Sequence, residues 1–306
     1  MYIMQTDYIL LALLEDLYPE EEAAVLYRSF VHDTSWYAQG LIAHQPDMLD
    51  RDVTGAVFSS ALSGSFDLIA REEGVISGLS VVEQVFHLIS PQIHFEPHAR
   101  DGDQVQQGTI ICTLHGSVPC ILLGERTALN FLCHLSGVAS RTRRFVELVA
   151  GTGARILDTR KTIPGLRALQ KAAVVHGGGM NHRFGLYDMV LIKNNHVDAA
   201  GGVREAIQRV RARWGEQFQI VVEVRDEAEV RAAVELMPTR IMLDNFAISA
   251  MREAVAAVAG RVPLEASGNV TMDSVRAIAE TRVDFVSIGG DLTLSAPRLD
   301  FSLHVR

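Results

Sequence analysis

Cysteine is scarce in this chain. Cys112, Cys120 and Cys133 are the only three in 306 residues, and no two of them stand in a CxxC spacing. An odd count without paired spacings excludes a disulfide framework and a zinc module of the common kinds. Each is expected to be a small buried apolar side chain in a reducing compartment, which favours a cytoplasmic protein.

Long apolar runs and an excess of positive charge are also missing. The run Tyr8 to Leu14 near the start is too short to span a bilayer, and the acidic stretch that follows it is unlike a signal peptide. The formal net charge is −9 and the pI is near 5.7. No long basic stretch is present, so neither a nucleic-acid partner nor a membrane is expected.

Composition is that of a large globular protein. With 48% hydrophobic and 21% charged residues in 306, the chain can fold as two domains or as one barrel with an appendage. Before residue 125, strand-like stretches such as 66–79 and 92–118 predict antiparallel strands. The second stretch resembles a biotinyl carrier hairpin, but it contains no Lys to accept a cofactor, so it is interpreted as scaffold.

From Gly124 onward, helical stretches alternate with apolar strands. A long helix is predicted over Glu125 to Ala150, and six short apolar runs follow, separated by amphipathic segments. This alternation predicts parallel strands joined by helices. The first strand is not followed by a dinucleotide-binding glycine pattern, which favours an α/β barrel over a doubly wound sheet.

Positive charge is concentrated in one segment of this barrel. From Arg155 to Lys193 there are seven cations against Asp158 and Asp188, so the segment carries +5 and the remainder −14. Such a cluster suits a small polyanionic ligand that carries carboxylates or phosphates. Arg160 alone has a simpler alternative, an ion pair with Asp158.

Chemically active residues follow the predicted strands in a definite order. Parallel strands bring their carboxyl ends to one edge, where barrel enzymes gather their catalytic groups. Cations come first, two carboxylates suited to Mg²⁺ follow, and two turns of small residues suited to a phosphate come last. The residues at these strand ends are Arg160, Lys161, Lys193, Glu223, Asp244, Ser267, Gly268, Gly289 and Gly290.

Several of these motifs together resemble one family. The stretches "ERTALNFL", "DTRKTIPGLRALQK", "HGGGMNHRFGLYDMVLIKNNHV", "IVVEV", "IMLDN" and "EASGNV" resemble quinolinate phosphoribosyltransferase, the carboxylating nicotinate-nucleotide pyrophosphorylase of NAD synthesis. The resemblance is continuous from about Gly124 to Gly290. Before residue 124 it is looser and depends mainly on "RDVTG" and "IAREEGVISGL".

The resemblance implies a fold and an assembly. It implies an N-terminal α/β domain with a mainly antiparallel sheet over residues 1–123, to which the tail 297–306 returns, and an incomplete α/β barrel over 124–296. It also implies a homodimer or higher homo-oligomer whose active site is completed by a neighbouring subunit. Residues 20–49 are expected to be an insertion, since "EDL" and "RDVTG" normally lie closer together.

The resemblance further implies a reaction and its residues. Quinolinate would react with phosphoribosyl pyrophosphate to give nicotinate mononucleotide, pyrophosphate and CO₂, with Mg²⁺ and no organic cofactor. Arg126 would reach in from the other subunit. Glu223 and Asp244 would position Mg²⁺, and Ser267, Gly268, Gly289 and Gly290 would hold the 5-phosphate. The residues around the quinolinate carboxylates would be Arg160, Lys161, His182, Arg183 and Lys193.

The chain differs from the usual family wording in three places. Asn194 replaces an acid, Asn269 replaces a glycine, and Asp291 follows Gly290 in a turn that lacks the family's histidine. Two alternatives stay open, which are a same-fold enzyme acting on another carboxylated ring and a non-catalytic paralogue that binds a phosphorylated metabolite. His182 alone would more often be structural, and His176 and His196 are interpreted as structural or supporting residues.

Overall fold

A computed structural model describes residues 2–32 and 34–306, and it divides the chain into two units. The first unit runs to Ser140 and takes in residues 297–306, and the second contains residues 141–296. The boundary expected after residue 123 lies inside helix α6 (Val118–Leu148), which continues past the division.

The first unit begins with a run of helices. Pro19 separates the first two, because it cannot continue α1 but is well tolerated ahead of a new helix, and three glutamates open α2, where the helix dipole favours them. The expected insertion, residues 20–49, supplies most of this helical run. The elements are α1 (Tyr2–Leu17), α2 (Glu20–His32), η1 (Thr34–Ala38), α3 (Leu41–His44), α4 (Met48–Arg51) and η2 (Gly55–Val57).

A four-stranded antiparallel sheet follows, in the order β12-β1-β5-β3. Its strands are β1 (Ser63–Ala70), β3 (His94–Pro97), β5 (Ile110–Ser117) and β12 (Phe301–Val305), and a small second sheet pairs β2 (Gly74–Val75) with β4 (Gln104–Val105). Helix α5 (Leu79–Ile89) packs closely on α6, since a Cβ at Gly124 would lie 2.6 Å from Ile89 Cδ1. Strand β12 comes from the far end of the chain and pairs with β1 along Phe66 to Ala70.

Helix α6 begins seven residues earlier than the sequence predicted. It starts at Val118, directly after β5, instead of at Glu125. Pro119 is accommodated in the first turn, where helical N–H groups have no partner within the helix in any case. The apolar residues that follow therefore belong to the helix and not to the strand.

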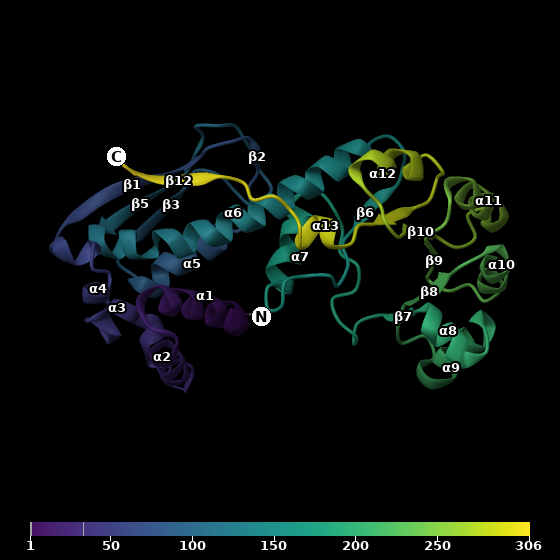
Figure 1. Ribbon diagram of the computed structural model, residues 1–306, viewed down its shortest axis with the longest axis horizontal. Coiled ribbons are helices and arrows are strands. Elements are labelled where there is room, and N and C mark those ends of the chain that lie inside the picture. The colour runs from purple at the N-terminus through teal and green to yellow at the C-terminus, as the bar shows by residue number, and fades with distance from the viewer. Residues whose placement is uncertain (1, 33) are drawn as a thin grey trace. The chain divides into compact units, whose positions relative to one another are not determined.

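The second unit is an incomplete α/β barrel. Six parallel strands lie in the order β6-β11-β10-β9-β8-β7, so β6 and β7 form its two edges, and the helices cover the outside of the row (Figure 1). This architecture confirms the six strands and the barrel class predicted from the sequence. The strands are β6 (Arg155–Leu157), β7 (Val190–Ile192), β8 (Ile220–Val224), β9 (Arg240–Asp244), β10 (Leu264–Ser267) and β11 (Phe285–Ser287).

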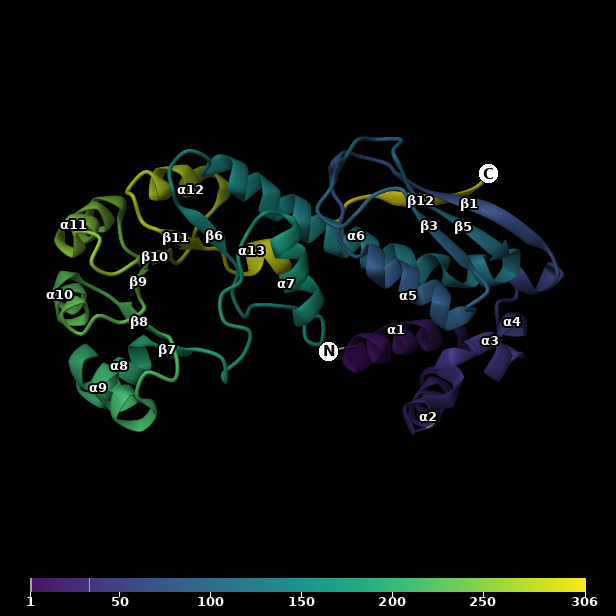
Figure 2. The same ribbon diagram turned by 180° about the vertical axis from the view of Figure 1, so that it is seen from behind.

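The helices between these strands end and begin at recognisable signals. Asp226 caps α10 by accepting the N–H of Glu229, and Thr271 forms a capping box with Ser274 at α12. Figure 2 shows the same row of helices from behind. The helices are α7 (Arg167–His176), α8 (Asn194–Ala200), α9 (Val203–Trp214), α10 (Glu227–Glu235), α11 (Ile248–Val258), α12 (Met272–Ala279) and α13 (Gly290–Thr293).

Candidate active site

The carboxyl ends of the parallel strands gather the predicted site residues of the second unit. Asp244 and Ser267 are register partners at the ends of β9 and β10, and Glu223 lies on β8 beside Met242. Lys193 follows β7, Arg160 and Lys161 follow β6, and Gly289 follows β11. Strand geometry alone therefore brings the cations, the carboxylates and the small-residue turns to one edge of the sheet.

Glu223 and Asp244 form a carboxylate pair on neighbouring strands. Asn194, the first residue of α8, connects them: its backbone N–H donates to Glu223 Oε2 at 3.1 Å, and its side-chain Nδ2 donates to Asp244 Oδ2 at 3.0 Å. His196 supports the same helix start, because its Nδ1 accepts the N–H of Lys193 at 2.9 Å. Both carboxylates are half-buried and are held in fixed positions.

Three of the seven cations in the segment serve the fold. Arg155 lies at the opposite end of β6, with its guanidinium 4.5 Å from the centre of the Phe285 ring. Arg167 donates to Thr162 Oγ1 and to the carbonyls of Phe184 and Arg160, which ties the loops together. Lys171 is 1% exposed and pairs with Asp158 at 2.6 Å, so Asp158 is not the partner of Arg160.

Four cations remain for a ligand, namely Arg160, Lys161, Arg183 and Lys193. Among the residues that the structure describes, none of the four forms an ion pair. Arg183 is 9% exposed, and its pKa is lowered by burial and by the nearby charge of Arg160, while Asp188 and Glu223 act in the opposite direction. Arg160 is half-buried, whereas Lys161 and Lys193 are exposed. A buried guanidinium next to a like charge is costly without a counter-charge, so the Arg183 end of this cluster is suited to bind an anion.

Lys161 reaches toward the turn that follows β11. A Cβ placed on Gly289 would lie 3.2 Å from Lys161 Nζ, so a glycine at this position leaves room for the ammonium group. The hydroxyl of Thr293 in α13 donates to the backbone carbonyl of Lys161 and fixes the loop from the other side. The cation and the glycine turn thus share one corner of the site.

His182 is held by the protein through one of its two ring nitrogens. Its Nδ1 accepts the N–H of Arg183 at 2.7 Å, and its Nε2 lies 3.5 Å from Glu265 Oε2. Glu265 is fully buried and pairs with Arg240 at 2.7 Å. The ring is 6% exposed, and its Nε2 is buried without a hydrogen-bond partner in the described chain.

Sequence reasoning missed Glu265, Arg240 and the Lys171–Asp158 pair. A signal for Glu265 was present, because an acid within the apolar run "VPLEA" is as costly to bury as Glu223 in "IVVEV". Asp158 also holds the two residues that precede Arg183. It accepts the N–H of His182 at 2.7 Å, and the side-chain nitrogen of Asn181, when it faces inward, donates to Asp158 Oδ2 at 2.8 Å.

The turn after β10 requires its glycine. Gly268 has a φ of +101°, and a Cβ there would lie 2.1 Å from Asn245 Oδ1. Gly289 and Gly290 open α13, in which Asp291 is held by Arg141 through two hydrogen bonds of 2.7 and 2.8 Å. The negative charge of Asp291 is thereby compensated within the barrel.

The residues at this edge fit a magnesium ion. No group of three or more His, Cys, Asp or Glu arranged for a metal occurs in residues 2–32 and 34–306. Mg²⁺ commonly takes only one or two protein carboxylates and completes its shell with water and phosphate oxygens. Glu223 and Asp244 offer that number of carboxylates, and Asn194 keeps both in place.

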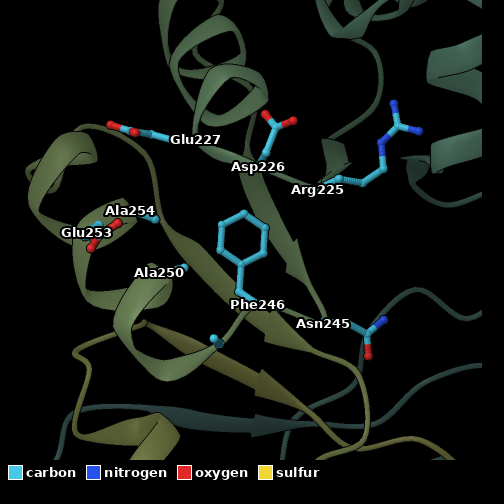
Figure 3. Close-up of a pocket in the computed structure, with 9 residues that line it drawn as sticks. Arg225, Asp226, Glu227, Asn245, Phe246, Ala250, Glu253 and Ala254 are labelled. Carbon is cyan, nitrogen blue, oxygen red and sulfur yellow. The ribbon is translucent and has the colours of Figure 1, made fainter.

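A hollow of about 290 Å³ lies between α10 and α11 and is lined in part by residues that directly follow β8 and β9. Figure 3 shows the ring of Phe246 pointing into it between Asp226 and Ala250, with Asn245 at its edge. None of the predicted site residues lines this hollow.

The fold and the site together define a class: an α/β-barrel enzyme that acts on anionic substrates. Comparison with protein families narrows the class. The family model "Quinolinate phosphoribosyl transferase, C-terminal domain" matches residues 138–304, and the model for the N-terminal domain of the same enzyme matches residues 52–136. The chain belongs to the quinolinate phosphoribosyltransferase family.

Individual relatives agree with this assignment. A probable nicotinate-nucleotide pyrophosphorylase [carboxylating] of Synechocystis is 42% identical over 78% of this chain and 81% of its own length. A mitochondrial quinolinate phosphoribosyltransferase [decarboxylating] of Nicotiana tabacum is 41% identical over 78% of this chain and 72% of its own length. The crystal structure of NadC from Streptococcus pyogenes superposes with a TM-score of 0.80 at 37% identity, covering 87% of this chain and 98% of that one.

Proposed function

We infer that the protein is a pentosyltransferase that joins quinolinate to phosphoribosyl pyrophosphate and releases pyrophosphate and CO₂, giving nicotinate mononucleotide for NAD synthesis. One observation carries the inference beyond family membership. Arg160, Lys161, Arg183 and Lys193 lack carboxylate partners within the described chain and meet the Glu223–Asp244 pair at one edge of the sheet. A dicarboxylate fits the cations, and the carboxylate pair fits the second substrate.

The cations account for quinolinate binding. Quinolinate carries two adjacent carboxylates, and two planar guanidinium groups are suited to grip them in bidentate fashion while lysine adds point charge. Arg183 Nη1 donates to the Met189 carbonyl at 3.3 Å, and the backbone N–H of Arg183 donates to His182 Nδ1 at 2.7 Å. His182 accordingly supports this clamp through Arg183.

The carboxylate pair accounts for the transfer step. When the ring nitrogen of quinolinate attacks C1 of the ribose, the C1–O bond to pyrophosphate breaks and positive charge develops on the sugar. In this proposal, the carboxylates of Glu223 and Asp244 stabilise that charge. Bound magnesium would neutralise charge on the leaving pyrophosphate.

Decarboxylation then requires no organic cofactor. The new nucleotide has a cationic ring nitrogen next to the carbon that carries the 2-carboxylate. When the bond to CO₂ breaks, its electron pair stays on that carbon, is stabilised by the adjacent positive nitrogen, and is finally protonated. The site only has to hold the ring, and the turns at Ser267, Gly268, Gly289 and Gly290 would hold the 5-phosphate through their backbone N–H groups.

We also propose a homodimer or higher homo-oligomer in which Arg126 serves a neighbouring subunit's site. Arg126 is exposed on α6 of the first unit and forms no ion pair among the described residues. A cytoplasmic location is proposed as well. No helix within the described chain has the length and apolar character needed to cross a membrane.

The test is a direct assay of the reaction. The protein is incubated with Mg²⁺, phosphoribosyl pyrophosphate and quinolinate labelled in its 2-carboxylate, and nicotinate mononucleotide and labelled CO₂ are measured. Both products should appear in equal amounts and only when both substrates are present. Nicotinate, which has one carboxylate, is the control substrate and should be converted poorly.

A matched variant tests the metal. Glu223→Gln keeps the shape and removes the charge, so activity should fall sharply and should require more Mg²⁺. Absence of product from quinolinate, or full activity in excess chelator, would contradict the respective part of the proposal. Equal use of nicotinate would favour an enzyme acting on another carboxylated ring.

A further inference from the structure

Both carboxylate oxygens of Asp244 are held by asparagine side chains. Oδ2 accepts from Asn194 Nδ2 at 3.0 Å, and Oδ1 accepts from Asn245 Nδ2 at 3.0 Å. The carboxylate cannot rotate without breaking at least one of these bonds. Asn194 Oδ1 lies buried with no hydrogen-bond partner in the described chain, so this amide loses one interaction to keep its nitrogen on Asp244.

The hydrogen bonds continue from Asp244 to the turn that follows β10. Asn269 Nδ2 donates to Asn245 Oδ1 at 3.2 Å, and the N–H of Asn245 donates to the carbonyl of Ser267 at 2.8 Å. Asn245 and Asn269 have φ values of +56° and +49°, in the left-handed region that asparagine tolerates better than most residues. Gly268 fits against the Asn245 side chain only because it has no Cβ.

We propose that Asn194, Asn245 and Asn269 are positioning residues that form one amide chain between the 5-phosphate turn and the carboxylate pair. Asn245 accepts a hydrogen bond at one end of its amide and donates at the other, so each bond polarises the next. Ordering the turn around a phosphate therefore also orders Asp244, and through Asn194 it also fixes Glu223. The 5-phosphate and the magnesium-bound pyrophosphate of one substrate would bind cooperatively, an inference that rests on the proposed function.

A double-mutant cycle tests the coupling. Asn194→Ala removes only the bond to Asp244, since the backbone N–H to Glu223 remains. Asn269→Gly removes the amide and keeps a residue that accepts a positive φ, so both variants should fold. The matched control is Gln208→Ala, which deletes an exposed amide from α9.

The main readout is binding without turnover. Calorimetry measures the Kd of phosphoribosyl pyrophosphate with Mg²⁺, while phthalate fills the dicarboxylate site; phthalate lacks the ring nitrogen and cannot react. Each single variant should raise the Kd about five- to tenfold. The double variant should raise the Kd by less than the product of the two single effects, and the difference from that product should be about threefold or more. Phthalate affinity and the melting temperature should stay close to wild type, as in Gln208→Ala.

The outcomes distinguish a failure of the amide chain from a failure of the proposed function. Effects that multiply in the double variant, or losses that track a lower melting temperature, overturn the amide chain while the enzyme stays active. A wild-type protein that neither binds phosphoribosyl pyrophosphate nor forms nicotinate mononucleotide refutes the proposed function and the chain with it. Non-multiplying losses at an unchanged melting temperature support the chain.

Discussion

The buried pair of Lys171 and Asp158 gives the most direct test of how the barrel supports its site. The Lys171 side chain is 1% exposed and Asp158 is fully buried, with 2.6 Å between Nζ and Oδ1. In Lys171→Met, Asp158 would stay buried with only the N–H of His182 and the Asn181 amide as donors. Breaking a buried pair costs about 3–5 kcal/mol, and two remaining donors place the loss near the lower end.

Calorimetry measures this loss as a lower melting temperature. For a unit of this size, about 3 kcal/mol corresponds to roughly 6–12 °C in the transition of the barrel. Asp158→Asn combined with Lys171→Met removes both charges and should be more stable than Lys171→Met alone. Arg231→Met is the control, because its pair with Glu227 is exposed, at 69% and 55%, and contributes about 1 kcal/mol or less.

The same variant should show a defined pH dependence. Burial raises the pKa of Asp158 above its ordinary value of 3.8, and burial lowers the pKa of Lys171. Without the lysine, the pKa of Asp158 should rise further. Because the pKa of Asp158 is then higher in the folded variant than in the unfolded chain, the folded variant loses stability as pH rises through that pKa. The loss of stability caused by Lys171→Met should therefore be smaller near about pH 5 than near about pH 8. A deficit no larger than that of Arg231→Met, or one that does not change with pH, would refute this reasoning.

Three further outcomes are expected. Lys161→Ala should weaken quinolinate binding more than phosphoribosyl pyrophosphate binding, by about 1.5–3 kcal/mol in calorimetry; equal losses for both ligands would remove Lys161 from the dicarboxylate site. Arg126→Ala and Lys193→Ala should each be inactive, and a mixture of the two that is dissociated and reassociated should regain activity. About half of randomly formed dimers are hybrids, and each hybrid has one intact site, so about a quarter of all sites are intact. Hybrids that mass spectrometry detects but that show no activity would exclude a shared site. Burial raises the pKa of Cys112 to about 12, so a thiol reagent near pH 7 should leave it unmodified until the protein is denatured, and rapid native modification would contradict that burial.

The sequence predicted the edge of the barrel where the candidate site residues gather, because parallel strands bring their carboxyl ends together whatever the details of packing. It did not predict which cations are free. Lys171 finds its partner 13 residues away, but Arg155 stacks on Phe285, which belongs to the last strand of the barrel. Side-chain partners that come from distant strands depend on the folded chain, and no local sequence pattern reveals them.

The sequence also did not predict the role of three asparagine side chains. Asn194 and Asn269 stand out as departures from the usual family wording, but asparagine carries no charge and these residues follow no period, so the sequence does not indicate that Asn194, Asn245 and Asn269 act together. Their importance comes from distances between strand ends that only the folded chain sets. Glu265, in contrast, could have been found from its apolar neighbours alone.

The return of β12 to the first sheet has a consequence for synthesis in the cell. Strand β1 pairs with β12 along five residues, and the whole barrel is made between the two strands. While the ribosome builds the barrel, the edge of β1 is therefore an unpaired strand, the kind of edge that other chains can pair with. The second unit is translated later than most of the first, but it is the first that can finish folding. Nascent chains stalled before residue 301 should therefore expose the edge of the first sheet to aggregation or to chaperones.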